Sequence, residues 1–268
     1  MTAVPVRRRL RAAGIASALA LAVVAGALGV WRPWAPLAST APLGAAAGEP
    51  AAAVAPAPLV LPEHPTALVF GDSWTYGSAA TVPTDGYAYR LADLISGETI
   101  VDGVRGSGYL KPGLDGPAFG ERIAALDPAL SPDLIILQGS INDREQGEAG
   151  YREAVTAAWD AMAARYPSAT IVILGPAPHE LPIGAGTLRI DADLSALAGA
   201  RGWWYISPVV ENWITEQNYL QLIDVEVGRK HPSDEGHRYL AEHVAAALDA
   251  LGGAPVTVAG GSETTPEQ

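Results

Sequence analysis

The sequence predicts an α/β fold in which a central, mostly parallel five-stranded sheet is covered by helices on both faces. Two observations lead to this prediction. Five short apolar runs recur between residues 66 and 207, and segments with helical periodicity lie between and after them. Strands that are apolar throughout, and not only at alternate positions, are typical of a parallel sheet with both faces buried.

Each run has the length of a single strand. The runs are TALVF (66–70), TIVDGV (99–104), DLIILQ (133–138), TIVILG (170–175) and WWYIS (203–207).

Two segments show the clearest helical pattern. Residues 148–166 carry apolar side chains three or four positions apart, which places them on one helix face, and Pro167 ends this helix. The last helix is expected over residues 234–251, with Gly252 just past its end.

Charge and composition divide the chain unevenly. The formal net charge is −12, but residues 1–60 hold five arginines and one acid, so the remaining chain carries −16. Such an acidic body repels nucleic acid, and we expect no nucleic-acid partner. The chain has no cysteine, which excludes disulfides, thiolate metal sites and a cysteine nucleophile.

The N-terminus has the features of an export segment. The cluster RRRLR precedes 19 uncharged residues, 12–30, and Trp31 and Trp34 follow. As a helix this run would span about 28 Å, close to the thickness of a bilayer core. We therefore predict that residues 1–34 are a signal peptide or a membrane anchor, with an extracytoplasmic body. The length of the run favours an anchor, and the small residues 38–47 leave cleavage open.

Three further segments follow. Residues 35–65, rich in Ala, Pro and Gly, are predicted to be a linker, 66–251 the folded domain and 252–268 a disordered tail.

Polar residues with catalytic chemistry follow the predicted strands. Gly71, Asp72 and Ser73 come after the first run, a Gly-rich segment with Gly106 after the second, and GSIND with Asn142 after the third. Because the carboxyl ends of parallel strands meet at one sheet edge, we expect these residues to share a site.

A histidine near the chain's end completes an acyl-transfer site. We predict that Ser73 attacks, that His237 takes its proton and that Asp234 orients the imidazole, since residues three apart are neighbours on a helix. The backbone N–H groups of Ser73 and Gly106 and the amide of Asn142 can point at a developing oxyanion.

Four blocks, in this order, resemble the SGNH hydrolases, the GDSL-type lipase and esterase superfamily. They are GDSW with Ser73, VRGSGY with Gly106, GSIND with Asn142 and DEGH with Asp234 and His237. The resemblance covers about residues 71–237. It implies a three-layer, flavodoxin-like α/β/α fold, hydrolysis of an ester through an acyl-enzyme, and no metal or organic cofactor.

Two positions depart from the family pattern. Trp74 follows the serine where an aliphatic residue is common, and we expect it either to pack under the turn or to bind substrate by narrowing the acyl pocket. Asp102 stands where the family often has asparagine, which bears on substrate fit more than on catalysis.

The remaining polar groups receive structural interpretations. We expect Asp72 to be a hydrogen-bonding residue of the turn, and His231, just before Pro232, to form a wall of the site and not its base. A metal site built from the residues of DEGH is disfavoured because neighbouring helix residues point apart. The imperfect Gly-rich match at 103–108, without a P-loop lysine, disfavours nucleotide binding.

These observations lead to three functional hypotheses. The first is an exported serine esterase that acts on short-chain acyl or O-acetyl esters of small molecules or carbohydrates. The second is an O-acyltransferase that uses the same site on an envelope glycan or lipid. The third is a non-catalytic envelope-binding domain, which the complete set of catalytic residues disfavours.

Overall fold

The computed structural model describes residues 56–252. The predicted segment 1–34, residues 35–55 of the linker and residues 253–268 of the tail lie outside this range. Among the residues that are described, no helix combines the length and apolarity needed to cross a bilayer.

Five parallel strands form the central sheet, as the sequence predicts. They are β1 (Thr66–Gly71), β2 (Glu98–Gly103), β3 (Leu134–Gln138), β4 (Thr170–Leu174) and β5 (Trp204–Ile206). Their order is β2-β1-β3-β4-β5, and every neighbouring pair is parallel. This is the flavodoxin-like order, in which the chain switches direction across the sheet at β1 and leaves a crevice beyond the carboxyl ends of the strands.

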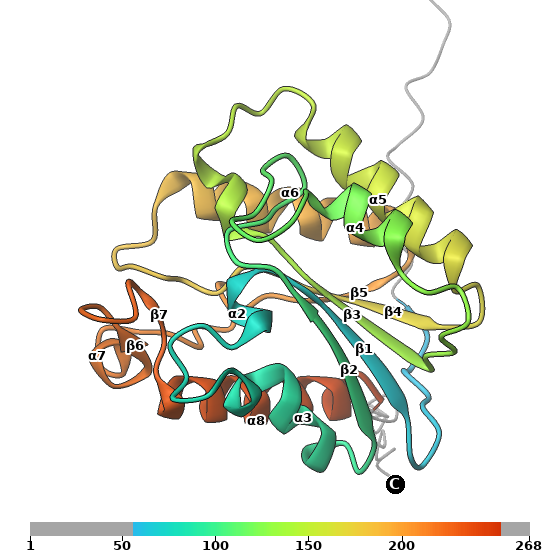
Figure 1. Cartoon of the computed structure of the whole chain (residues 1–268), viewed down its shortest axis with the longest axis horizontal. Coiled ribbons are helices and arrows are strands. Elements are labelled where there is room, and N and C mark those ends of the chain that lie inside the picture. The colour runs from blue at the N-terminus through green and yellow to red at the C-terminus, as the bar shows by residue number, and fades with distance from the viewer. Residues whose placement is uncertain (1–55, 253–268) are drawn as a thin grey trace, which may run out of the picture. The chain divides into compact units, whose positions relative to one another are not determined.

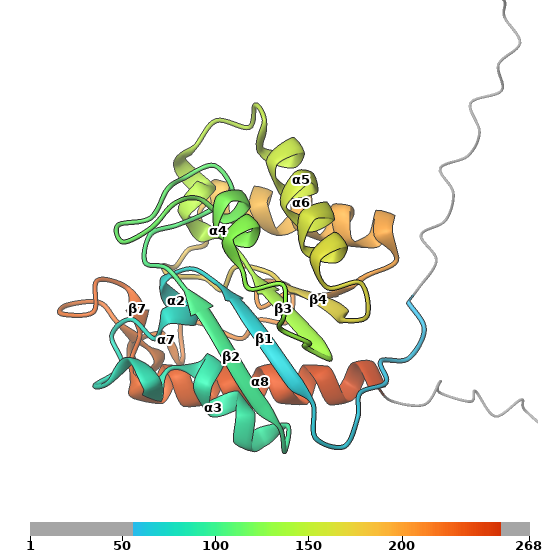
Figure 2. The ribbon, with the colours of Figure 1, turned by 45° about the vertical axis from the view of Figure 1, so that its right-hand side comes forward.

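Helices cover both faces of the sheet, which gives three layers (Figure 1). One face carries α3 (Tyr87–Leu94) and α8 (Asp234–Gly252). The other carries α4 (Phe119–Ala125), α5 (Tyr151–Arg165) and α6 (Ala185–Arg201). The view in Figure 2 shows the same two helical layers on either side of β1 and β2.

Strand β1 contributes side chains to both halves of the core. Ala67 and Val69 belong to the cluster under α3 and α8, while Leu68 and Phe70 belong to the cluster under α4, α5 and α6. Successive strand residues point to opposite faces, so a strand between two helical layers must be apolar at every position. This explains the unbroken run TALVF.

Short elements gather at the carboxyl edge of the sheet, at the left of Figure 1. They are α2 (Ser73–Tyr76), the 3₁₀ turns Pro83–Asp85 and Ile141–Glu145, α7 (Tyr219–Leu222), β6 (Ile223–Asp224) and β7 (His231–Pro232). The last two strands pair in antiparallel fashion, with Asp224 opposite His231. This small hairpin had no clear signal in the sequence.

The last part of the predicted linker is packed on the domain. Leu59 is buried in the core cluster under α8, and its N–H donates to the carbonyl of Leu251 over 2.8 Å. The ordered domain therefore begins several residues before Thr66.

Two glycines in helices allow a direct test of the packing. A Cβ on Gly236, in the first turn of α8, would lie 2.0 Å from the backbone oxygen of Leu222, whereas a Cβ on Gly199 in α6 would meet nothing within 4 Å. We expect Gly199→Ala to stabilise the protein by about 0.5–1 kcal/mol, because alanine restricts the unfolded chain and favours the helix. Gly236→Ala should instead lower stability, because backbone must move. Chemical denaturation of both variants measures this, and equal effects would contradict it.

Candidate active site

Ser73 is the first residue of α2, directly after the turn that follows β1. The chain leaves the strand at Gly71, and Asp72 caps the short helix by accepting the N–H of Trp74 at its Oδ1 over 3.0 Å. This cap satisfies one of the free N–H groups at a helix start. The helix then ends at once at Gly77, which is left-handed with a φ of 89°. The expectation that Asp72 is a structural residue of the turn agrees with this geometry.

The hydroxyl of Ser73 is hydrogen-bonded to His231. The distance from His231 Nε2 to Ser73 Oγ is 2.8 Å, and His231 Nδ1 lies 2.6 Å from the carbonyl oxygen of Gly228. Because a carbonyl can only accept, Nδ1 carries the proton and Nε2 is left with a lone pair toward the serine. The ring is thus held in the tautomer that can take a proton from Ser73.

Backbone hydrogen bonds shape the loop that carries the Gly228 carbonyl. Asp224 Oδ1 accepts the N–H groups of Glu226 and Val227, each over 3.0 Å, and its own carbonyl accepts the N–H of Lys230 over 2.7 Å. Arg229 and Lys230 take positive φ values of 52° and 66° to complete the turn. Asp224 therefore fixes the loop that orients His231, since the hydrogen bonds of its carboxylate go to backbone N–H groups of this loop.

No side chain fits at Gly228. A Cβ there would lie 2.6 Å from the Cβ of Ala79 and 2.8 Å from the Cβ of Asp224. An acid at this position would force the loop away from the 78–81 segment. The partner of the imidazole is accordingly a backbone dipole and not a carboxylate.

The structure does not bring His237 to Ser73, and the prediction that His237 is the base is wrong. The ring is fully buried; its Nε2 donates to the carbonyl of Ser78 over 3.0 Å, and its Nδ1 accepts the N–H of Tyr87 over 3.2 Å. Both nitrogens are therefore occupied by backbone. Burial lowers the pKa of His237 to about 4, so the ring is neutral.

Asp234 does not orient a catalytic imidazole either. Its Oδ1 accepts the backbone N–H of Thr81 over 2.7 Å, and its Oδ2 accepts the Thr81 hydroxyl over 2.6 Å. These hydrogen bonds lower the pKa of Asp234. Asp234 and His237 together fasten the segment 78–81 to the start of α8, and this segment forms a wall of the cleft next to Ser73.

Gly106 and Asn142 lie in the same cleft as Ser73. Gly106 has a φ of 75°, a conformation that favours glycine. The amide Nδ2 of Asn142 donates to the carbonyl of Ser107 over 2.9 Å and makes a longer contact of 3.4 Å with Asp72 Oδ2. The loop after β2 and the turn after β3 are thereby joined beside the serine.

The buried guanidinium of Arg122 holds the loop after β2 in place. Arg122 donates through Nη1 to the carbonyl of Gly71 and to the hydroxyl of Ser107, each over 2.8 Å. Its Nη2 donates to Asp102, with 2.6 Å to the carboxylate and 2.7 Å to the carbonyl oxygen. The aspartate that departs from the family pattern is therefore the ion-pair partner of Arg122.

Trp74 does not line the cleft, and its predicted contact with substrate is wrong. Only 4% of its surface is exposed, and it belongs to the core cluster under α3 and α8. Beside it lies an apolar cavity of about 10 Å³, too small for more than one water. Of the two alternatives from the sequence, packing under the turn is the one observed.

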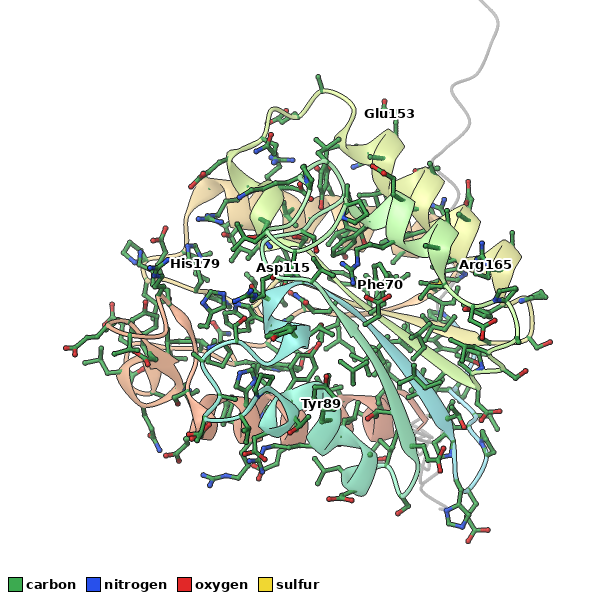
Figure 3. The ribbon with its side chains drawn as sticks, viewed as in Figure 1. Phe70, Tyr89, Asp115, Glu153, Arg165 and His179 are labelled. Carbon is green, nitrogen blue, oxygen red and sulfur yellow. The ribbon has the colours of Figure 1, made fainter. Side chains whose placement is uncertain are left out.

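The cleft above Ser73 is open and has a volume of about 690 Å³. Its walls come from three segments: residues 76–83, the loop 105–114 and the loop 224–229. A salt bridge of 2.6 Å from Lys230 to Glu180 ties the third wall to the segment after β4. Figure 3 labels the neighbouring His179, on the side of the molecule where β7 lies. Within residues 56–252, no cluster of three or more His, Cys, Asp or Glu side chains could hold a metal ion.

One signal in the sequence separates the two histidines. His237 lies on the same helix stripe as Leu240 and Val244, which face the core. A side chain at this position is therefore buried under α8. His231 precedes the helix, where side chains can reach the sheet edge. Asp234 and His237 in DEGH have the spacing of a catalytic acid and base, and this spacing favours His237 although its position is buried.

A serine hydroxyl hydrogen-bonded to a histidine, at the carboxyl edge of a parallel β2-β1-β3-β4-β5 sheet, is an arrangement that serine hydrolases use to activate a nucleophile. Residues 69–239 match the GDSL-like Lipase/Acylhydrolase family, and the chain belongs to this family of carboxylic ester hydrolases.

Known relatives agree with this membership. The GDSL lipase Rv0518 of Mycobacterium tuberculosis is 27% identical over 188 residues, which cover 66% of this chain and 78% of that protein. Two solved structures share the fold: the M. smegmatis aryl esterase (17% identity, 70% of this chain and 99% of that one, TM-score 0.53) and Est24, a carbohydrate acetylesterase from Sinorhizobium meliloti (16%, 70% and 99%, TM-score 0.54).

The position of Trp74 predicts a loss of stability without a change of specificity. Trp74→Ala should lower the free energy of unfolding by about 3–5 kcal/mol, as for other large core aromatics. The ratio of activities on acetyl and hexanoyl esters should not change, because the ring does not face the cleft. A shift of this ratio toward longer chains in the folded variant would contradict the placement.

The buried His237 predicts a pH-dependent loss of stability. The unfolded chain binds a proton at His237 near pH 6.5, whereas the folded chain does so only near pH 4. Stability is therefore complete above about pH 6.5 and is lost as the pH falls toward 4. Between pH 7 and 4.5, wild type should lose about 2 kcal/mol more than His237→Gln. Urea denaturation at both pH values measures this, and parallel losses would refute it.

Proposed function

We propose that this protein is an exported serine esterase that cleaves carboxylic esters through an acyl-enzyme, with Ser73 as nucleophile and His231 as base. The observation that supports this most directly is the 2.8 Å hydrogen bond between His231 Nε2 and Ser73 Oγ at the floor of an open cleft. Serine is a weak nucleophile alone, and an adjacent general base is what activates it.

The proton movements follow from the tautomer. His231 Nε2 accepts the proton of Ser73 as Oγ attacks the ester carbonyl, and the imidazolium then donates that proton to the leaving alcohol oxygen. A water molecule next gives a proton to Nε2 and attacks the acyl-enzyme, and the proton returns to Ser73 as the acid leaves. Throughout, the Gly228 carbonyl holds Nδ1–H and keeps Nε2 directed at the serine.

The developing oxyanion would be held by the N–H groups of Ser73 and Gly106 and by the Asn142 amide. One amide hydrogen of Asn142 is committed to the Ser107 carbonyl at 2.9 Å, while the other makes only the 3.4 Å contact with Asp72. The second N–H makes only this long contact, so an oxyanion within its reach could replace Asp72 as its acceptor at little cost.

Short-chain acyl or O-acetyl esters of small molecules or carbohydrates are the proposed substrates. The cleft is open to solvent and large enough for a sugar-sized alcohol. The structural relatives include an aryl esterase and a carbohydrate acetylesterase. Export, by an N-terminal segment that is either cleaved or kept as an anchor, rests on the RRRLR cluster and the uncharged run 12–30.

Substitution of the two histidines tests whether the general base is His231, as proposed here, or His237, as the sequence suggests. On p-nitrophenyl acetate, Ser73→Ala and His231→Ala should each lower kcat by about 10⁴-fold or more, because nucleophile and base act as one unit. His237→Gln should keep kcat within about tenfold of wild type while its melting temperature falls.

The assay compares the full-length chain and its three variants, each checked for folding by circular dichroism. An active Ser73→Ala would exclude the nucleophile. An active, folded His231→Ala together with an inactive, folded His237→Gln would show that the general base is His237 in α8 and not His231. Added glycerol or sugar acceptors that divert the acyl group from free acid would indicate acyl transfer in place of hydrolysis.

A further inference from the structure

Two exposed apolar side chains stand on different walls of the cleft. Leu114, on the loop after β2, is 81% exposed, and Val227, on the loop before β7, is 88% exposed. Both line the same cleft as Ser73 and His231. Single exposed apolar side chains are common on protein surfaces, but two of them on the walls of a cleft that holds Ser73 and His231 provide apolar surface for a ligand.

Leu114 lies directly over the oxyanion loop. The atom nearest to a Cβ built on Gly106 is Leu114 Cγ, at 3.5 Å, and the Leu114 N–H donates to the Arg105 carbonyl over 2.7 Å. The loop is closed again by a hydrogen bond of 2.8 Å from Gly113 to Gly116. The backbone therefore fixes the leucine at the cleft although its side chain has few neighbours.

Val227 is fixed in the same way on another wall of the cleft. Its N–H donates to Asp224 Oδ1 over 3.0 Å, and the next residue, Gly228, holds His231. The lining of the cleft also includes small residues, among them Ala79 and Ala80. A chain leaving the reacting carbonyl thus has room in the cleft and apolar side chains on two of its walls.

The apolar cavity beside Trp74 does not compete for a hydrocarbon chain. It has a volume of about 10 Å³, which leaves room for no more than one water-sized group. We therefore place an alkyl chain of the substrate in the open cleft, where Leu114 and Val227 are the large exposed aliphatic side chains among the lining residues.

We infer that Leu114 and Val227 form an apolar clamp that binds the hydrocarbon chain of the ester and that, among the short-chain and O-acetyl esters proposed above, favours those longer than ethyl acetate. This inference rests on the esterase proposed above and specifies its substrate class. The chain belongs either to the acyl group or to the alcohol, and the walls do not distinguish the two. Full burial of one methylene group favours binding by about fourfold, and burial against an open wall by about twofold.

The experiment measures kcat/KM of the full-length protein on two ester series below their aggregation concentrations. The acyl series is p-nitrophenyl acetate, butyrate and hexanoate. The alcohol series is ethyl, butyl and hexyl acetate, and its hydrolysis is measured by the release of acetate. In at least one series we expect kcat/KM to rise about tenfold from the shortest to the longest member. The series that rises identifies the side of the ester that carries the chain.

The variants Leu114→Ser and Val227→Ser should each reduce this rise at least threefold, with little effect on the shortest ester. Val210→Ser is the matched control, because Val210 is also exposed (72%) but does not line the cleft. All three positions are on the surface, so unchanged melting temperatures are expected and verify folding.

Three results would overturn the clamp: flat series in wild type, a rise that survives both cleft variants, or a rise seen only above the aggregation concentration, which would indicate docking to a lipid surface. Each of these can occur while short esters are still cleaved in a Ser73-dependent manner, and the esterase proposal would then stand. If no ester is hydrolysed in a Ser73-dependent manner, both the esterase proposal and the clamp are wrong.

Discussion

The buried guanidinium of Arg122 is the contact on which the geometry of the site depends. It joins the end of β1, the end of β2 and the Ser107 hydroxyl, and it lies 4.1 Å from the ring centroid of Phe70. A buried cation is costly unless it is paired and hydrogen-bonded. Asp102 supplies the charge, and the two carbonyls and the hydroxyl supply acceptors, so the loop with Gly106 can take few other positions.

The opposite side of the site is built from α8 and the small hairpin. Asp234 and His237 hold the 78–81 segment, and Asp224 holds the turn that presents the Gly228 carbonyl. The two halves meet at Gly228, where the 78–81 segment and the hairpin approach so closely that no Cβ fits. The residues that sequence patterns assign to catalysis therefore position a cleft wall, while the imidazole comes from the neighbouring turn.

The sequence predicted the fold well, and the reason lies in the strands. A strand covered on both faces requires apolar residues at nearly every position, as in β1 and β3, and five mostly apolar runs can be recognised in the sequence. Helix α6 was harder to see, because its inward face carries Asp191, whose carboxylate accepts the hydroxyls of Tyr205 and Ser207. A buried, satisfied acid interrupts the apolar stripe that marks a helix.

The site was only partly predictable. The turns with Ser73, Gly106 and Asn142 follow strands directly, and strand ends converge on one edge by topology, so their placement in one cleft could be inferred. The choice between His231 and His237 depends on which of two side chains six residues apart faces the serine. The apolar stripe of α8 indicates that His237 is buried. The hydrogen bond from His231 to Ser73 depends on the pairing of β6 with β7 and on the Gly228 carbonyl, and the residue pattern shows neither of these.

A backbone carbonyl as the partner of His231 changes the electrostatics of the reaction. The dipole fixes the tautomer but supplies no full negative charge to the imidazolium that forms during attack. Asp72, directly before the nucleophile, is a buried acid; burial raises the pKa of Asp72 to about 6, and the charge of His231 lowers it. The residue that caps the nucleophile turn is thus electrostatically coupled to the histidine, although its carboxylate hydrogen-bonds to Trp74 and Asn142.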